Sequence, residues 1–307
     1  MLDSTLALYL VPVVWGATFP AAKIVLRHMP IASFMAWTRG TGLLAIAAAT
    51  PLLRRTEARA VADERPPARS VLLPALVLGT LIFASYTLQT EGLARTTATN
   101  AGFITGLYVV FTPLIAALVL RRRVPGIAWV AIAASVAGLA LLSVKHLATI
   151  RPHVGDLLVL AGAVGWACHI TVMERVSPRF PVWMLSTAQM AVTAILQVGA
   201  ALATAGLRPA DALSARVWPL LVLTGVFGSG LAYTMQIVAQ QRMTSTRAVV
   251  LLGGEALFSA LFAAVWIGER LAPHQWLGAA LVLGAMVVSE LAARGPSAVV
   301  VEPASAE

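Results

Sequence analysis

The sequence predicts an all-α membrane protein of ten transmembrane helices, arranged as two inverted five-helix repeats. Three observations predict this fold: the composition, a series of long apolar segments, and an internal repeat. Of the 307 residues, 59% are hydrophobic and 11% are charged, whereas a soluble domain carries roughly 25% charged residues. Because so little polar surface is present to face water, most of the exterior is expected to face lipid.

Ten apolar segments have about the 20 residues that a membrane-spanning helix needs. They cover approximately residues 5–26, 30–53, 71–92, 97–120, 125–144, 155–174, 181–204, 217–240, 247–268 and 274–293. Residues 54–70 form a charged loop, and residues 295–307 form a small, polar tail that is predicted to be disordered. The first segment lacks a preceding basic region, so we interpret it as a retained helix and not as a cleaved signal peptide.

The basic residues predict the orientation of the chain. The formal net charge is +9, but the basic residues lie in short connections and form no patch of the kind that nucleic acid would require. They concentrate in the 54–70 loop and in Arg121–Arg123, on the side of the membrane where the N-terminus lies. The positive-inside rule therefore predicts a multi-pass protein of the cell inner membrane with both termini cytoplasmic.

An internal repeat divides the chain into residues 1–146 and 147–294, each with five spans. Before the 54–70 loop the spacing between matched residues is 151, and after the loop it is 147. The matches include Trp15 with Trp166, Pro30 with Pro181, Tyr86 with Tyr233, Gln89 with Gln236, Arg95 with Arg242, and Trp129 with Trp276. Since five is an odd number, the second copy must be inverted. Inverted repeats are typical of secondary transporters, which bind their substrate at the repeat interface near the middle of the membrane.

Polar residues within the bilayer are costly and usually face a cavity or a partner. Trp15 and Thr18 are three residues apart, as are their repeat mates Trp166 and His169, so each pair shares one helix face. Two aromatic rings and two polar groups at equivalent depths would suit a small amphipathic solute. The alternative interpretation is that the tryptophans only pack the helix core.

A second group of repeat mates consists of Tyr86, Gln89, Tyr233 and Gln236. These residues are expected either to line the passage or to join adjacent helices, and interhelical hydrogen bonds of this kind contribute roughly 0.6–2 kcal/mol. Two further candidates for substrate binding are Asn100 and Tyr108.

Arg39 and Glu255 are the charged residues placed deepest in the predicted spans. Arg39 could bind a substrate carboxylate through its forked donors, or it could have a structural role, binding helix-end carbonyls or pairing with an acid. Glu255 could exchange a proton, because removal from water favours a neutral carboxyl, or it could belong to a buried ion pair. The adjacent Gly253–Gly254 could loosen the helix, although small residues also permit close packing.

The sequence predicts neither a catalytic site nor a cofactor. Cys168 precedes His169, but adjacent residues on a helix point in different directions and would not pair as nucleophile and base. The chain contains no metal-ligand cluster and no Gly-rich phosphate loop. The expected partners are therefore a small-molecule substrate and the lipid bilayer.

Several motifs together resemble the EamA family of the drug/metabolite transporter superfamily. They are Trp15–Pro20 (WGATFP), Pro30 followed by Arg39, Gly155–Leu158 (GDLL), Gly254–Phe258 (GEALF) and Gly268–Arg270 (GER). One departure is that Arg121–Arg123 lacks a glutamate equivalent to Glu269. The resemblance covers nearly the whole chain. It implies export or facilitated movement of small polar metabolites, such as amino acids, across the inner membrane.

Three alternatives compete with this function. A membrane-embedded enzyme would need clustered His or acidic residues at one interfacial level. A membrane protein without transport would not need matched polar residues in both repeats. A transporter of phosphorylated sugars would favour several Lys or Arg residues in its cavity, and Arg39 is the one that the sequence offers.

Overall fold

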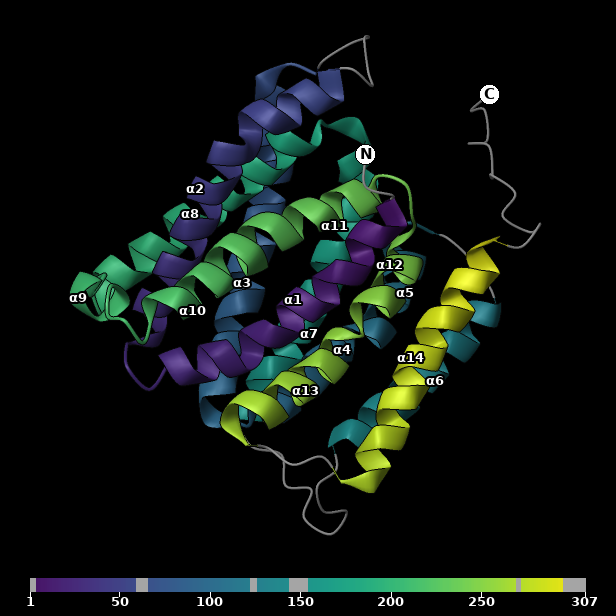
Figure 1. The fold of residues 1–307 in the computed structure, drawn as a ribbon. Coiled ribbons are helices and arrows are strands. Elements are labelled where there is room, and N and C mark those ends of the chain that lie inside the picture. The colour runs from purple at the N-terminus through teal and green to yellow at the C-terminus, as the bar shows by residue number, and fades with distance from the viewer. Residues whose placement is uncertain (1–3, 59–65, 122–125, 144–153, 269–271, 295–307) are drawn as a thin grey trace.

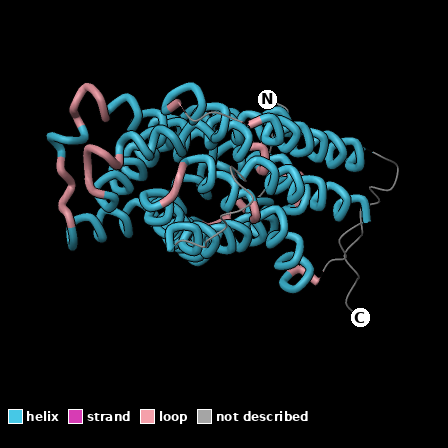
Figure 2. Tube along the Cα trace, turned by 90° about the horizontal axis from the view of Figure 1, so that it is seen from below, coloured by secondary structure: helices cyan, strands magenta, loops and turns pink. Residues whose placement is uncertain are grey.

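The computed structural model describes residues 4–58, 66–121, 126–143, 154–268 and 272–294. The described chain is helical and contains no strand (Figures 1 and 2). Several stretches named above lie outside the described residues, namely residues 59–65 of the 54–70 loop, Arg122 and Arg123, Glu269 and Arg270, and the 295–307 tail.

Two sets of helices correspond to the two predicted repeats. The first set is α1 (Ser4–Val25), α2 (Ile31–Ala58), α3 (Leu72–Arg95), α4 (Ala98–Gly106), α5 (Tyr108–Val119) and α6 (Gly126–Ser143). The second set is α7 (Val154–Val176), α8 (Val182–Thr204), α9 (Pro209–Ala212), α10 (Trp218–Val222), η3 (Leu223–Leu231), α11 (Ala232–Gln240), α12 (Ser245–Leu252), α13 (Glu255–Ile267) and α14 (Pro273–Arg294). The 3₁₀ turns η1 (Ala68–Val71) and η2 (Ser177–Arg179) precede α3 and α8.

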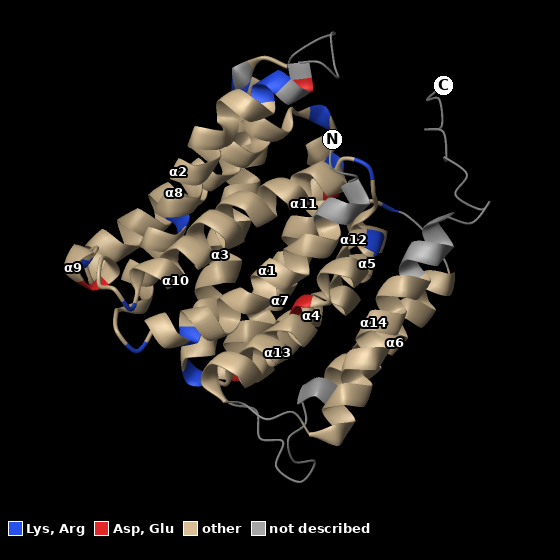
Figure 3. Ribbon diagram, viewed as in Figure 1, with Lys and Arg blue, Asp and Glu red and all other residues tan. Residues whose placement is uncertain are grey.

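Length and apolarity identify eight spans among the described residues, in place of the ten expected. The expected fifth and tenth spans fall on two shorter apolar helices, Gly126–Leu141 and Pro273–Val288. Large apolar side chains cover the outside of the bundle, with Leu118 and Val265 each 79% exposed. Figure 3 shows the charged residues mostly near the two ends of the bundle. This distribution is that of a multi-pass membrane protein.

The contacts between helices keep their pattern when the two halves are exchanged. Helix α1 packs against η3, α11 and α13, and its counterpart α7 packs against the matching helices α3 and α5. Helix α2 packs against η3 just as α8 packs against α3, and α2 and α8 also contact each other. Helix α6 pairs with α14 at one edge of the bundle (Figure 1). The two halves are therefore interleaved, and the core lies between them.

Two spans are broken near their middle at equivalent positions. Helix α4 ends at Gly106 and α5 begins at Tyr108, while α12 ends at Leu252 and α13 begins at Glu255. Tyr108 and Glu255 are 147 residues apart, so each opens the second half of its span. A Cβ atom added to Gly253 would lie 3.0 Å from Val109 Cγ2, which shows that the two breaks lie against each other.

The third and eighth spans, although repeat mates, differ in backbone. The third span is α-helical from Leu72 to Arg95, whereas the eighth passes through η3, a π-helical segment of nine residues between α10 and α11. π-Helical turns are rare and often accompany functional sites.

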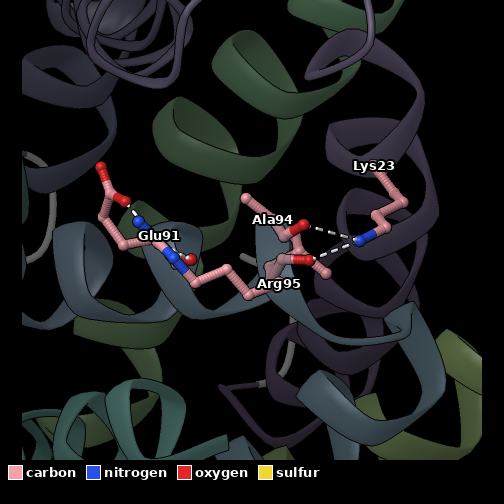
Figure 4. A network of polar contacts seen from close by, with 5 residues as sticks. Lys23, Glu91, Ala94 and Arg95 are labelled. Atoms are coloured by element: carbon pink, nitrogen blue, oxygen red, sulfur yellow. Dashed lines mark hydrogen bonds and ion pairs between the residues drawn. The ribbon is translucent and has the colours of Figure 1, made fainter. Parts of the chain in front are cut away.

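Side chains of opposite charge bind helix ends at equivalent places in the two halves. Lys23 Nζ donates hydrogen bonds to the carbonyls of Leu93, Ala94 and Thr96, at 2.7, 3.3 and 2.6 Å, where α3 ends. Figure 4 shows the contact with Ala94. Glu174, 151 residues after Lys23, accepts hydrogen bonds from the Ser245 amide and hydroxyl, at 2.8 and 2.6 Å, where α12 begins. A cation therefore satisfies free carbonyls and an anion satisfies a free amide, as the helix dipole favours.

Candidate functional site

A cavity between the two halves brings together most of the residues selected from the sequence. The space free of atoms is about 520 Å³, its open mouth included. The predicted residues that line it are Trp15, Thr18, Arg39, Tyr86, Gln89, Tyr108, Trp166, Tyr233, Gln236 and Glu255.

The two tryptophans hold equivalent positions and each joins the two halves. Trp15 Nε1 donates to the Gly228 carbonyl at 2.9 Å, and Trp166 Nε1 donates to Gln89 Oε1 at 2.6 Å. The indole N–H groups are thus satisfied while the rings remain part of the cavity wall. The partners are not equivalent, because Trp15 bonds to the backbone of η3 whereas Trp166 bonds to a side chain of α3.

Tyr233 connects the aromatic residues of the wall. Its ring centroid lies 5.1 Å from that of Trp15 and 6.1 Å from that of Trp166, distances at which aromatic rings attract each other. His169 contacts the Trp166 and Tyr233 rings edge-on. It is fully buried, with Nε2 3.4 Å from Gln189 Oε1. His169 therefore lies behind the wall and not on the cavity surface, in contrast to its mate Thr18.

Arg39 is a buried cation held by both halves. Its side chain is 2% exposed, and Nη1 donates to Ser229 Oγ at 2.7 Å. The guanidinium carbon lies 3.7 Å from the centre of the Tyr86 ring and 5.4 Å from that of the Tyr233 ring. Both distances permit cation–π attraction. Nε has no hydrogen-bond partner among the described residues, so the guanidinium retains donor capacity.

Glu255 and Tyr108 form a second polar region of the cavity. Glu255 is 3% exposed and Tyr108 is 2% exposed. The two side chains lie within reach of each other, but among the described residues neither Glu255 Oε1 nor the Tyr108 hydroxyl makes a hydrogen bond of ordinary geometry. Arg39 and Glu255 do not form an ion pair with each other, which was one of the alternatives considered above. The ion pair that Figure 4 shows joins Glu91 and Arg95 on α3.

Asn100 does not contact the cavity. It lies in the first turn of α4, and its backbone amide donates to the Thr97 hydroxyl at 3.1 Å, which caps the helix. The sequence placed Asn100 inside a span because the apolar segment begins at residue 97, but here the segment begins with a helix cap.

Six further residues line the cavity that sequence reasoning did not select. They are Phe19, Thr105, Ile170, Thr224, Gly228 and Ser229. The sequence prediction favoured polar residues that are matched between the repeats, whereas the mates of Thr105 and Ser229 are the apolar residues Leu252 and Ile82. The signal that could have identified Thr105, Thr224 and Ser229 is the presence of a hydroxyl within an apolar span.

The cavity combines two polar regions of different chemistry with aromatic walls. Arg39 offers a cation whose Nε–H has no hydrogen-bond partner among the described residues, and Glu255 with Tyr108 offers a carboxyl and a hydroxyl. Such a site can bind a small amphipathic solute. Groups of His, Cys, Asp and Glu suited to a metal ion are not found within the described ranges.

Comparison with known proteins agrees with this architecture. The EamA-like transporter family matches residues 4–144 and again residues 153–290. A protein of Archaeoglobus fulgidus named "Uncharacterized transporter" is 30% identical over 296 residues, covering 94% of this chain and 86% of its own length. A solved crystal structure superposes with a TM-score of 0.73 at 20% identity, covering 94% of this chain and 96% of that one, which supports the fold. The chain therefore belongs to the EamA-like transporter family and is a membrane transporter, not an enzyme.

Proposed function

We propose that the protein is a secondary transporter or facilitator that exports small polar metabolites, amino acids or related zwitterions, across the inner membrane by alternating access. The observation that carries this proposal is the arrangement of charge in the cavity. Arg39 on α2 is basic and Glu255 on α13 is acidic, both are buried, and they are not paired with each other.

A zwitterion matches these two regions. A carboxylate can accept hydrogen bonds from the guanidinium of Arg39, and an ammonium group can donate to Glu255 and the Tyr108 hydroxyl. The rings of Trp15, Trp166 and Tyr233 provide apolar wall for the rest of the molecule. Arg39 is the one basic residue among the described lining residues, so the cavity suits a single carboxylate better than a phosphorylated sugar.

The repeat provides a route to two access states. The pattern of helix contacts is preserved when the halves are exchanged, so an inverted copy would allow a second state with the roles of the halves reversed. The two broken spans cross at the cavity, where loss of regular backbone hydrogen bonds is tolerated because the backbone lies against protein and cavity.

The direct test is transport by the purified protein in liposomes. Counterflow of labelled L-phenylalanine, L-leucine and L-threonine should be compared with that of their carboxamides and of glucose 6-phosphate, with and without a pH gradient. We expect uptake of at least one free amino acid and weaker uptake of its carboxamide. Uptake of glucose 6-phosphate in preference to every amino acid would overturn the proposed substrate class.

A further inference from the structure

The π-helical segment η3 brings one hydroxyl, that of Ser229, to the buried cation of the cavity. Ser229 is 1% exposed, and its Oγ accepts a hydrogen bond from Arg39 Nη1 at 2.7 Å. The same Oγ donates to the Thr224 carbonyl at 3.1 Å. Thr224 precedes Ser229 by five residues, the spacing of a π-helix, so the serine also satisfies a carbonyl within the irregular segment.

Close contact between α2 and η3 fixes this geometry. A Cβ atom added to Gly42 would lie 2.6 Å from Ser229 Cβ, and one added to Gly225 would collide with the Thr41 hydroxyl. The two backbones therefore touch one turn from Arg39. Helix α2 and segment η3 cannot move apart without breaking the contact of Gly42 with Ser229 and that of Gly225 with Thr41. The position of Ser229 relative to Arg39 is consequently set by the fold and not by a flexible side chain alone.

The other half of the molecule has no equivalent of this pair. The mate of Arg39 is Met190, at a spacing of 151, and the mate of Ser229 is Ile82, at a spacing of 147. Both mates are fully buried and apolar, and the backbone around Ile82 is α-helical. The polar pair and the π-helical segment thus occur together in one half, whereas the Trp, Tyr and Gln residues occur in both.

We infer that Ser229 is a specificity-determining positioning residue, which holds the Arg39 guanidinium so that its remaining N–H groups face a carboxylate in the cavity. This inference rests on the proposed function and extends it from Arg39 to the segment that orients Arg39. Because Ser229 fixes Nη1 and the guanidinium lies against the Tyr86 ring and near the Tyr233 ring, its N–H groups point in a defined direction. Bidentate recognition of a carboxylate depends on such a direction.

The test compares Ser229→Ala and Ser229→Thr with the wild type, using L-phenylalanine and L-phenylalaninamide as probes. Ser229→Ala should raise the KM for phenylalanine about tenfold relative to that for the amide, because it removes a hydrogen bond to a charged group. The maximal rate should change little, and Ser229→Thr should restore the preference because it keeps a hydroxyl. A carboxylate preference that is unchanged in Ser229→Ala would overturn the inference.

Ser33→Ala is the matched control. Ser33 is also fully buried on α2 and donates to a carbonyl, that of Gly206 at 2.6 Å, but it does not line the cavity. This variant should lower stability without altering the ratio of the two KM values. An equal change in the ratio for Ser33→Ala would show a general packing effect and would overturn the assignment.

A structure of the Ser229→Ala protein separates this inference from the proposed function. If the wild type transports neither probe, the proposed substrate class fails, and the inference is then judged from the density for Arg39. A guanidinium displaced from its place against the Tyr86 ring supports the positioning role. A guanidinium that stays in place contradicts it.

Discussion

Arg39 and Glu255 each have an uncharged mate in the other repeat, Met190 and Tyr108. At the scale of the residue, this difference makes the two polar regions of the cavity unlike each other, because the Trp, Tyr and Gln pairs around it are matched between the repeats. A buried cation with free donors and a buried carboxyl with a free oxygen are costly in an apolar interior. A solute that binds between them supplies hydrogen-bond partners and offsets this cost of burial. Substitutions at Arg39 and at Glu255 test this account.

Arg39→Met, which introduces the residue of the equivalent position, should abolish the preference for free amino acids. Hydrogen bonds to charged groups contribute about 1.5–3 kcal/mol, so we expect the KM for L-phenylalanine in liposomes to rise by at least about tenfold. Arg39→Lys keeps the charge but lacks the fork, and it should restore only part of the preference. Wild-type transport kinetics in the Met variant would exclude a role in substrate binding.

Glu255→Gln tests whether transport is coupled to protons. If Glu255 exchanges a proton during the cycle, the variant should still carry substrate but should no longer respond to an imposed pH gradient. If the protein is a facilitator, wild type and variant should both ignore the gradient. The comparison is made in the same liposomes, with counterflow as the control for folded protein.

At the scale of the element, charged side chains that lie just outside the spans also bind the ends of helices. Glu57, near the end of α2, accepts a hydrogen bond from the Val182 amide at the start of α8, at 2.9 Å. Arg54 lies over the Trp183 ring, with its guanidinium carbon 3.9 Å from the ring centre. Together these two contacts join the second and seventh spans at one end.

The Glu57 contact should make stability depend on pH. Burial raises the pKa of the Glu57 carboxyl, an effect opposed by its hydrogen bonds to the backbone of Val182 and Trp183. A raised pKa in the folded protein means that the folded state binds the proton more tightly than the unfolded state. The stabilisation is therefore complete below the unfolded pKa and is lost as pH rises through the folded pKa.

Glu57→Gln keeps an acceptor for the Val182 amide but cannot ionise. We expect the melting temperature of the variant in detergent to change less than that of the wild type as pH rises from about 4, near the usual carboxyl pKa, to about 8. Titration of other carboxyls is common to both proteins and cancels in the difference. Parallel pH profiles for the two proteins would contradict this account.

The Lys23 contact with the end of α3 gives another prediction for an element. Lys23→Met should lower stability by about 1–3 kcal/mol, because it leaves buried carbonyls without a donor. Arg27→Met is the control, since Arg27 is exposed just beyond the end of the same helix. Thermal unfolding of the two variants in detergent should separate them, and equal melting temperatures would show that water replaces the lysine.

At the scale of the whole molecule, orientation in the membrane remains a prediction from the basic residues. Since Cys168 is the one cysteine, a Cys168→Ser background allows single cysteines to be placed. In intact cells, an impermeant thiol reagent should fail to label Ala60→Cys and should label Arg208→Cys, because these positions lie in connections expected on opposite faces. Strong external labelling at position 60 would contradict the orientation and the inverted register built on it.

The features that sequence reasoning could predict are those that both halves repeat. Matched Trp, Tyr and Gln residues identified the cavity wall, and Gly253–Gly254 indicated a loosened helix where α12 and α13 are in fact separate. The break at Leu107 lacks a glycine pair, and the π-helical segment has the same apolar character as the α-helix of its mate. His169 and Asn100 were placed by depth along a helix, but depth does not decide which side chains reach the cavity surface.

The two rings near the Arg39 guanidinium come from repeat mates, Tyr86 and Tyr233, and their centres lie at unequal distances of 3.7 and 5.4 Å from it. If the halves exchange roles during the transport cycle, the near ring becomes the far one while the cation stays in place. The Arg39 guanidinium would then keep its position and exchange its close contact with Tyr86 for one with Tyr233. The cation–π energy lost with the first ring would be regained with the second. A structure of the opposite-facing state should accordingly show the guanidinium closer to Tyr233 than to Tyr86.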